Sequence, residues 1–275
     1  MDYYKFSILC PPDKMEILIA LFSSQPFEMF EEKEEGFDAF LPVVALDRKV
    51  EIYVESLRQQ HDFSMVKTLI PGQNWNRLWE SNFEPVVVGD FCGIRADFHP
   101  PLQQVAHEIV INPKMAFGTG HHETTFIVIQ HMQRIAFTAK NVLDFGCGTG
   151  ILSILASKLG ADEVDAVDIE EQSFLNTQEN AKINGVSNIH AIHGTLNDVP
   201  QRQYDVILAN INRHVILDSL PTLSGRLLAG GILVASGILL TDEQMVVEAQ
   251  KKAGFRTLEI LKKNNWLSIK SVRQD

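Results

Sequence analysis

Asp144-Phe145-Gly146-Cys147-Gly148-Thr149-Gly150 is the stretch that decides the fold. A short apolar run from Asn141 ends in the carboxylate of Asp144, three glycines alternate with other residues, and Ile151 to Lys158 has the apolar periodicity of a helix. Glycine permits backbone conformations that other residues avoid, and it lets a ligand approach the backbone closely. The pattern therefore predicts a strand, a tight ligand-binding turn and a helix.

The spacing of the glycines and the acid before them discriminate between ligands. A dinucleotide-binding turn needs a third glycine three positions after the second, and Ile151 occupies that position here. A carboxylate at the end of the strand attracts the ammonium of a methionine moiety and repels a pyrophosphate. We therefore expect S-adenosylmethionine as the cofactor, with Asp144, Gly146 and Gly148 among its contacts. The alternative is a glycine-rich turn that serves only strand–helix packing.

The sequence around this stretch alternates short apolar runs with amphipathic segments of helical length, which is typical of β-α repeats around a parallel sheet. The last two runs are separated by only four residues, too few for a crossover helix, so they must pair as an antiparallel hairpin at the sheet edge. We expect an α/β fold with a doubly wound, seven-stranded sheet of the methyltransferase type. Its strands are predicted at residues 141–144, 163–168, 189–193, 205–210, 231–236, 255–261 and 266–272.

Polar residues at the ends of the predicted strands are the candidate site residues. Asp168 ends the second strand and is expected to bind a ribose diol, unless it is a solvated or helix-capping aspartate. Asn210 ends the fourth strand, where its amide oxygen could align a neutral amine for methyl transfer, so it is the predicted catalytic residue. Its alternative is a cap for the next helix. For Asp198, contact with an adenine and an ordinary turn remain equally open.

The segment from Asn112 to Thr125 is not explained by the sheet alone. Its glycines and hydroxyl side chains lead into a predicted helix from Phe126 to Ile135, which indicates a loop that folds over a ligand. A metal site at His121-His122-Glu123 is disfavoured, because adjacent histidines on a helix diverge by about 100° and the metalloprotease spacing is absent. We therefore expect no metal.

The first part of the chain has a different pattern. A strand from Tyr3 to Leu9, a helix from Asp13 to Phe22, a hairpin of residues 27–32 and 36–42, and a helix from Asp47 to Gln60 predict a small α+β domain that resembles a ferredoxin-like layer. The predicted domains are residues 1–70, a linker at 71–83, and a methyltransferase domain at 84–275.

Composition sets limits on location and partners. No window of the 275 residues approaches the roughly 18 apolar residues of a membrane-spanning helix, and the start lacks a secretory signal, so we expect a cytoplasmic protein without a membrane partner. The three cysteines have neither zinc-ligand spacing nor the even count of a disulfide framework. A net charge of −11 favours a basic partner over nucleic acid. We expect a monomer.

The segment from Met115 to Thr125, together with the stretch from Asp144 to Gly150 and Asn210-Ile211-Asn212, resembles the PrmA-type methyltransferases. This resemblance implies cofactor contacts at Thr125, Gly146, Asp168 and Asn210. It also implies that Phe117, Thr119 and Gly120 belong to a loop that closes over the cofactor. The amino-terminal domain would recognise the target, a large-subunit ribosomal protein, which would receive methyl groups on lysine side chains and on its α-amino group.

The residues after the fourth strand bear on the substrate. Many amino-methyltransferases have prolines and an aromatic residue there, whereas this chain has Asn210-Ile211-Asn212-Arg213. A planar nitrogen profits from stacking on such an aromatic ring, so its absence argues against nucleobase or glutamine substrates and fits lysine. Two alternatives stay open: a methyltransferase that acts on RNA, a small amine or another protein, and a module that binds the cofactor or the ribosome without catalysis.

Overall fold

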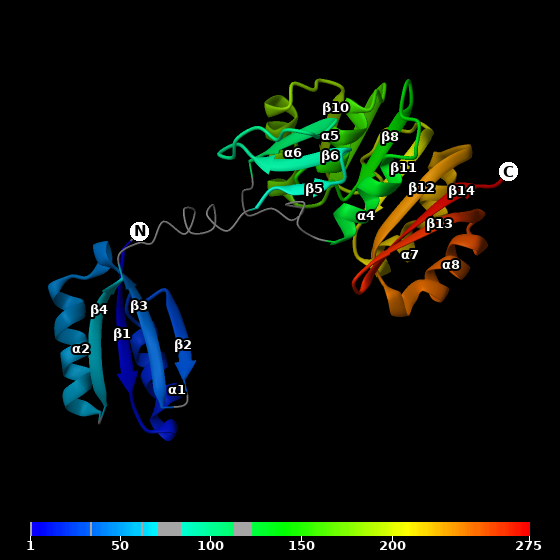
Figure 1. Cartoon of the computed structure of the whole chain (residues 1–275). Coiled ribbons are helices and arrows are strands. Elements are labelled where there is room, and N and C mark those ends of the chain that lie inside the picture. Colours follow the sequence, from blue (N-terminus) through cyan, green and yellow to red (C-terminus); the bar gives the residue numbers. More distant parts are fainter. Residues whose placement is uncertain (1, 34, 62, 71–83, 113–122) are drawn as a thin grey trace. The chain divides into compact units, whose positions relative to one another are not determined.

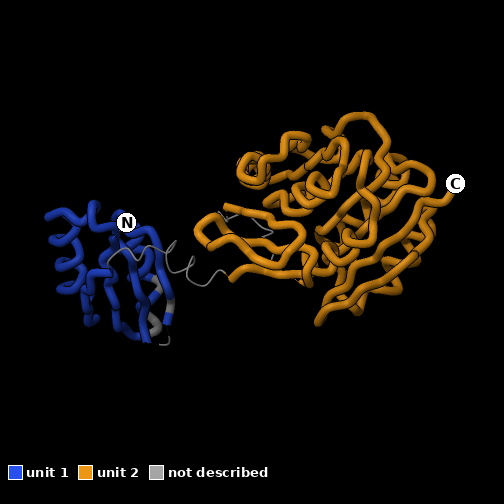
Figure 2. The backbone as a smooth tube through the Cα atoms, turned by 45° about the horizontal axis from the view of Figure 1, so that its top comes forward, with its two compact units in different colours: residues 1–83 blue, residues 84–275 orange. Residues whose placement is uncertain are grey.

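The chain consists of two compact units, Met1–Phe83 and Glu84–Asp275 (Figure 2). The structure, a computed structural model, describes residues 2–33, 35–61, 63–70, 84–112 and 123–275. The predicted linker at residues 71–83 lies outside the described residues.

The smaller unit is an α+β unit with one antiparallel sheet (Figure 1). The strand order β2-β3-β1-β4 places the first strand in the middle of the sheet. The strand, hairpin and helices predicted for this unit are confirmed. Its last strand, Ser64–Ile70, was not predicted, because most side chains of that strand are exposed and show no pattern of buried positions. In chain order the elements are β1 (Tyr3–Leu9), α1 (Pro12–Ser23), β2 (Met29–Lys33), β3 (Gly36–Pro42), α2 (Arg48–Gln60) and β4 (Ser64–Ile70).

Aromatic packing and a helix cap stabilise this unit. Phe22 is fully buried, and its ring lies 5.2 to 6.1 Å from the rings of Phe27, Phe37 and Phe63 in edge-on contacts. The side chain of Asp47 accepts hydrogen bonds from the backbone N–H groups of Lys49 and Val50, which explains why α2 begins there.

The larger unit is built on the predicted seven-stranded sheet, with strand order β10-β9-β8-β11-β12-β14-β13 (Figure 1). The pairs among β10, β9, β8, β11 and β12 are parallel, and the closing hairpin is antiparallel at the sheet edge, as predicted. The strands are β8 (Asn141–Phe145), β9 (Glu163–Asp168), β10 (Ile189–His193), β11 (Tyr204–Asn210), β12 (Leu227–Leu239), β13 (Phe255–Lys263) and β14 (Trp266–Arg273).

Helices cover both faces of this sheet. Along β14, Leu267 and Ile269 lie in one core cluster with residues of α7 and α8, whereas Ser268 between them lies beside His131 of α4. Because successive side chains of a strand point to opposite faces, α4 packs on the face opposite to α7 and α8. The helices are α4 (Glu123–Met132), α5 (Ile151–Lys158), α6 (Glu171–Ile183), α7 (Arg213–Arg226) and α8 (Glu243–Lys252).

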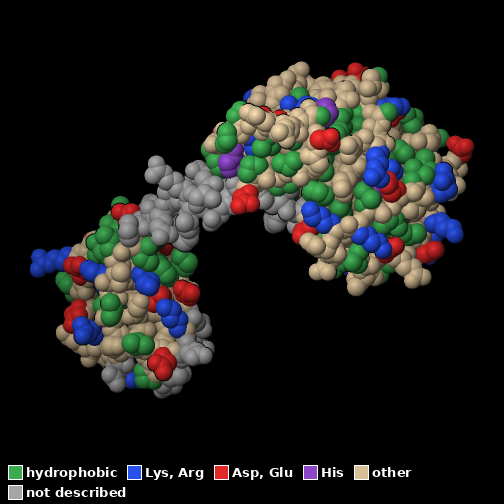
Figure 3. Space-filling view, in the orientation of Figure 1, with side chains coloured by type: hydrophobic (Ala, Val, Ile, Leu, Met, Phe, Trp, Pro, Cys, Tyr) green, Lys and Arg blue, Asp and Glu red, His purple; other side chains and the backbone are tan. Residues whose placement is uncertain are grey.

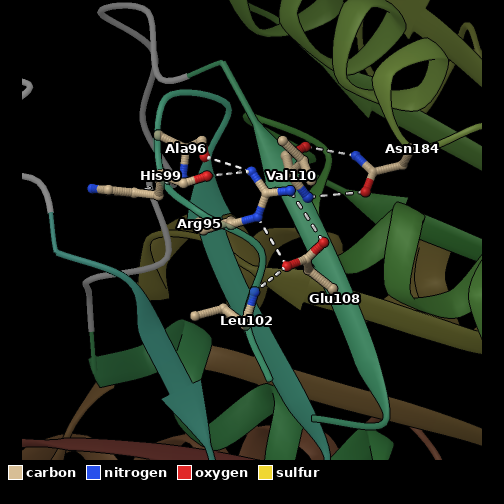
Figure 4. A network of polar contacts seen from close by, with 7 residues as sticks. All are labelled: Arg95, Ala96, His99, Leu102, Glu108, Val110 and Asn184. Carbon is tan, nitrogen blue, oxygen red and sulfur yellow. Dashed lines mark hydrogen bonds and ion pairs between the residues drawn. The ribbon is translucent and has the colours of Figure 1, made fainter. Parts of the chain in front are cut away.

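Residues 84–111 form a small three-stranded sheet that the sequence analysis did not predict, since its strands are short and glycine and proline interrupt their apolar runs. The strands are β5 (Val86–Val88), β6 (Cys92–Ala96) and β7 (His107–Ile111). An ion pair between Arg95 and Glu108 links the last two strands, with Nε and Oε1 2.9 Å apart (Figure 4). Arg95 also donates to the backbone carbonyls of Ala96 and His99, and Glu108 accepts from the N–H of Leu102. The loop between β6 and β7 is thereby fixed at both ends.

Asn184, at the end of α6, joins this small sheet to the large one. Its side-chain oxygen accepts from the N–H of Val110 at 2.9 Å, and its side-chain nitrogen donates to the carbonyl of Val110 at 2.6 Å (Figure 4). One amide therefore satisfies both backbone groups on the free side of β7.

On the face drawn in Figure 3, basic and acidic side chains are interspersed over both units. In the part of the chain that the structure describes, no helix combines the length and the apolar character needed to cross a membrane.

Replacing Asn184 by alanine should weaken the attachment of β7. The N–H and the carbonyl of half-buried Val110 would lose their side-chain partner, which costs about 1 kcal/mol for each hydrogen bond. We expect a corresponding loss in the free energy of unfolding of the larger unit, measured by urea denaturation. Gln178→Ala, at an exposed position of α6, is the matched control. Equal stability of the two variants would contradict the role assigned to Asn184.

Candidate functional site

The carboxyl ends of the parallel strands bring the predicted site residues to one edge of the sheet. In the strand register Leu208 of β11 lies opposite Asp144 of β8, and Phe145 lies opposite Val167 of β9. Asn210 and Asp168 end their strands just beyond these pairs. Asp144, Asp168 and Asn210 therefore occupy the edge where ligands of doubly wound sheets bind.

The turn after β8 has a conformation that requires glycine. Gly146, Gly148 and Gly150 have φ values of +78°, +54° and +80°, which lie in the left-handed region. A Cβ atom on Gly146 would also come within 2.1 Å of the Cγ2 of Ile211, which follows Asn210. The glycine loop, residues 144–150, is thus packed directly against the end of β11.

Asp144 lies beneath the glycine loop and not on its surface. Its side chain is only 1% exposed, and Ser153 Oγ of α5 donates a 2.6 Å hydrogen bond to its Oδ2. Its Oδ1 is buried and has no hydrogen-bond partner in the part of the chain that the structure describes. Burial raises the pKa of Asp144 to about 7, and the nearby negative charge of Asp168 acts in the same direction. A positive charge beside Oδ1 would favour the ionised carboxylate.

Asp168 holds the glycine loop through the backbone. Its Oδ2 accepts a 2.9 Å hydrogen bond from the N–H of Gly148, and its Oδ1 accepts one from the N–H of Glu170 at 3.0 Å. Each carboxylate oxygen can accept a second hydrogen bond. The structure therefore places Asp168 beside the loop, half-buried, with acceptor capacity left for a ligand.

Thr125 and Asn210 lie in contact although 85 residues separate them in the sequence. Asn210 Nδ2 donates to Thr125 Oγ1 at 3.3 Å. Thr125, near the start of α4, is 3% exposed, and Asn210 is half-buried. Because its nitrogen donates to Thr125, the amide of Asn210 has a defined orientation.

Helix α6 supplies site residues that the sequence analysis missed. Thr177 Oγ1 donates to the carbonyl of Gly148 at 3.0 Å, and Asn180 Nδ2 donates to the carbonyl of Thr149 at 2.8 Å. Asn180 Oδ1 accepts from the N–H of Asn112 at 2.8 Å. One buried asparagine thus joins the glycine loop to the residue that precedes segment 113–122. The available indication was the run of Asn and Thr at helical spacing on a face that should be apolar.

The remaining predicted residues fall into two groups. Phe117, Thr119 and Gly120, like His121 and His122, lie outside the described residues. Asp198 serves a local turn, because its Oδ2 accepts from the N–H of Thr195 at 2.8 Å and from its hydroxyl at 3.0 Å. Of the two interpretations of Asp198, these contacts support the turn.

Comparisons with known proteins find relatives over nearly the whole chain. A model of the family described as ribosomal protein L11 methyltransferase (PrmA) matches residues 21–274. The chain is 36% identical over 285 residues to the ribosomal protein L11 methyltransferase of Porphyromonas gingivalis, a match that covers 97% of this chain and 96% of the relative. It is 36% identical over 273 residues to that of Phocaeicola vulgatus, with 96% and 95% covered.

A solved structure is similar as well. The crystal structure of a ribosomal protein L11 methylase from Lactobacillus delbrueckii subsp. bulgaricus matches with a TM-score of 0.64 and 28% sequence identity. The match covers 70% of this chain and 99% of that one.

The buried carboxyl of Asp144 should make stability depend on pH. Its pKa in the folded state is about 7, whereas an unperturbed aspartate has a pKa of about 3.9. Between these values the folded chain holds a proton that the unfolded chain releases, so the free energy of unfolding falls as pH rises, by up to about 1.4 kcal/mol per pH unit.

Asp144→Asn should remove this contribution. We expect its free energy of unfolding, measured in urea from pH 4.5 to 8 without added ligand, to fall less steeply with pH than that of the wild type. Asp218→Asn, at an exposed position of α7, should keep the wild-type dependence. Parallel curves for wild type and Asp144→Asn would show that the carboxyl does not titrate in this range.

Proposed function

The chain belongs to the PrmA family of ribosomal protein L11 methyltransferases, and we propose that it transfers methyl groups from S-adenosylmethionine to amino groups of ribosomal protein L11. The resemblance predicted from the sequence is confirmed by the family match and by the relatives. The observation that carries the proposal is the contact between Thr125 and Asn210, because it sets an oriented amide beside the glycine loop. The acceptors are lysine side chains and the α-amino group.

The residues at the sheet edge fit S-adenosylmethionine. Asp144 offers a buried Oδ1 that has no hydrogen-bond partner among the residues described, which suits the ammonium of the methionine moiety. Gly146 and Gly148, whose left-handed φ values shape the loop, are proposed backbone contacts, and Asp168 retains acceptor capacity for the ribose. Thr125, Phe117, Thr119 and Gly120 complete the proposed contacts. When bound, the cofactor supplies a sulfonium methyl group, which is transferred to nitrogen by in-line displacement.

Asn210 is the proposed catalytic residue, and its task is to align the attacking amine. A lysine amine has a pKa near 10.4 in water, so the site must favour its neutral form before the lone pair can attack. Desolvation among apolar groups favours the neutral form, and the partly buried Ile211 supplies such a group next to Asn210. Because Asn210 Nδ2 donates to Thr125, its side-chain oxygen is left to accept a hydrogen bond from the amine.

The smaller unit is the proposed recognition domain for L11. Its β-α-β-β-α-β order and the sheet order β2-β3-β1-β4 support a ferredoxin-like fold, joined to the methyltransferase domain, residues 84–275, by a linker at 71–83. The overall charge of −11 would attract a basic ribosomal protein. A cytoplasmic monomer is part of the same proposal.

RNA is the alternative acceptor. The mixture of charges in Figure 3 offers no basic stripe on the face drawn, and such a stripe is the usual footprint of an RNA-binding enzyme. Incubation with radiolabelled S-adenosylmethionine and either purified L11 or ribosomal RNA separates the two proposals. Label on L11 supports protein methylation. Label on RNA alone, with salt-sensitive RNA binding, would replace it.

Asn210→Ala should lower the turnover for L11 while much of the affinity for S-adenosylmethionine remains. A misplaced amine can cost on the order of 100-fold in rate, because in-line transfer tolerates little error in alignment. Methylation of L11 measures turnover, and calorimetric titration measures cofactor affinity. Gln244→Ala, at an exposed position of α8, is the control.

The same variant separates an enzyme from a binding module. Wild-type turnover that Asn210→Ala lacks supports catalysis at this site. Undiminished turnover in Asn210→Ala would rule out the alignment role. A wild type that binds the cofactor but labels no acceptor would favour a module that binds without catalysis.

A further inference from the structure

The turn of the carboxyl-terminal hairpin contacts the first turn of α4, next to Thr125. Asn264 Nδ2 donates a 3.0 Å hydrogen bond to Glu123 Oε1. The Nζ of Lys263 lies 3.4 Å from the centre of the Phe126 ring, in a cation–π contact. These residues come from the far end of the chain, since 141 positions separate Asn264 from Glu123.

The same hairpin also fixes the other end of α4. Glu259 of β13 forms ion pairs with Arg134, just after the helix, and with Lys270 of β14, the latter at 2.7 Å. Buried His131 lies with its Nε2 3.3 Å from the carbonyl of Ser268 in β14. The helix has only ten residues, so contacts at both ends leave little freedom to slide or tilt.

Asn264 combines two properties that its position demands. Its φ of +51° lies in the left-handed region, which asparagine tolerates better than most residues other than glycine. Its amide also donates to Glu123, which glycine could not do. Asn264 therefore fits the turn and also supplies its hydrogen bond to α4.

From these contacts we propose that the hairpin turn Lys263–Asn264 positions Thr125, and through it Asn210, with Asn264 as the main positioning residue. The inference rests on the proposed function, because it assigns the hairpin a part in methyl transfer only if Thr125 and Asn210 form the site. Thr125 lies between Glu123 and Phe126 on the first turn of α4, so displacement of these neighbours displaces its hydroxyl. A hydrogen bond of the hairpin thus sets the geometry at the end of β11.

The test is Asn264→Gly, which keeps access to the left-handed conformation and removes only the amide. We expect faster hydrogen exchange of the backbone amides of residues 127–129, which donate to the carbonyls of residues 123–125 in the first turn of α4. The dissociation constant for S-adenosylmethionine and its KM should rise about three- to tenfold, the factor that loss of one hydrogen bond typically causes. The kcat for L11 should fall as well, because Thr125 orients the amide of Asn210 that aligns the amine.

Two further variants isolate the contact. Lys262→Ala removes a neighbouring cation that pairs with Glu243 of α8 and not with α4, so exchange at α4 and cofactor affinity should stay at wild-type values. In the double variant Asn264→Gly/Glu123→Ala, the loss of affinity for S-adenosylmethionine should equal the loss in Glu123→Ala alone, because both changes remove the same hydrogen bond.

The outcomes distinguish this inference from the function on which it rests. Unchanged exchange and unchanged cofactor affinity in Asn264→Gly would overturn the positioning role, whatever the enzyme methylates. Losses of cofactor affinity that add up in the double variant would also overturn the positioning role of Asn264. A wild type that fails to methylate L11 contradicts the proposed function, while exchange and cofactor titration still report on the contact between the hairpin and α4.

Discussion

The candidate site depends on hydrogen bonds between the backbone of the glycine loop, residues 144–150, and the side chains around it. Backbone bonds satisfy only part of this loop, because the N–H groups of Gly146 and Cys147 donate to the carbonyl of Val167 and that of Gly150 donates to the carbonyl of Cys147. The side chain of Asp168 accepts a hydrogen bond from the N–H of Gly148, and that of Thr177 donates one to the carbonyl of Gly148. The side chain of Asn180 donates to the carbonyl of Thr149. An unsatisfied buried backbone group costs about 1 to 3 kcal/mol, so these contacts determine whether the loop keeps its shape.

Helix α6 extends this constraint to the rest of the larger unit. Asn180 also accepts from the backbone of Asn112, and Asn184 one turn later holds β7 through both backbone groups of Val110. The small sheet and the glycine loop are therefore held by hydrogen bonds to the same face of helix α6. A conventional apolar face could fill the same volume, but it could not fix a backbone in position with comparable directionality.

The sequence was informative where periodicity or backbone conformation limits the choice of residues. The strands of the large sheet and the glycine loop follow from apolar runs and from positions that only glycine accommodates well. The strands of residues 86–111 gave too short a pattern, and the polar face of α6 runs against the rule that buried faces are apolar. The contacts of Asn210 with Thr125 and of Asn264 with Glu123 span 85 and 141 residues. Pairings over such distances follow from the fold and not from local patterns.

Asp144 is a candidate site residue whose position at a strand end follows from the sequence, whereas its burial does not. An exposed carboxylate at the strand end would attract a cation at little cost, whereas the observed one is buried with one oxygen that has no hydrogen-bond partner among the described residues. In the folded chain without a ligand this arrangement favours the protonated form below about pH 7 and lowers stability when the carboxyl ionises. A cationic ligand beside Oδ1 reverses both effects, because it stabilises the carboxylate and relieves the desolvation penalty. Burial of Asp144 would therefore couple the stability of the folded chain to binding of a cationic ligand beside Oδ1, more strongly than an exposed aspartate would.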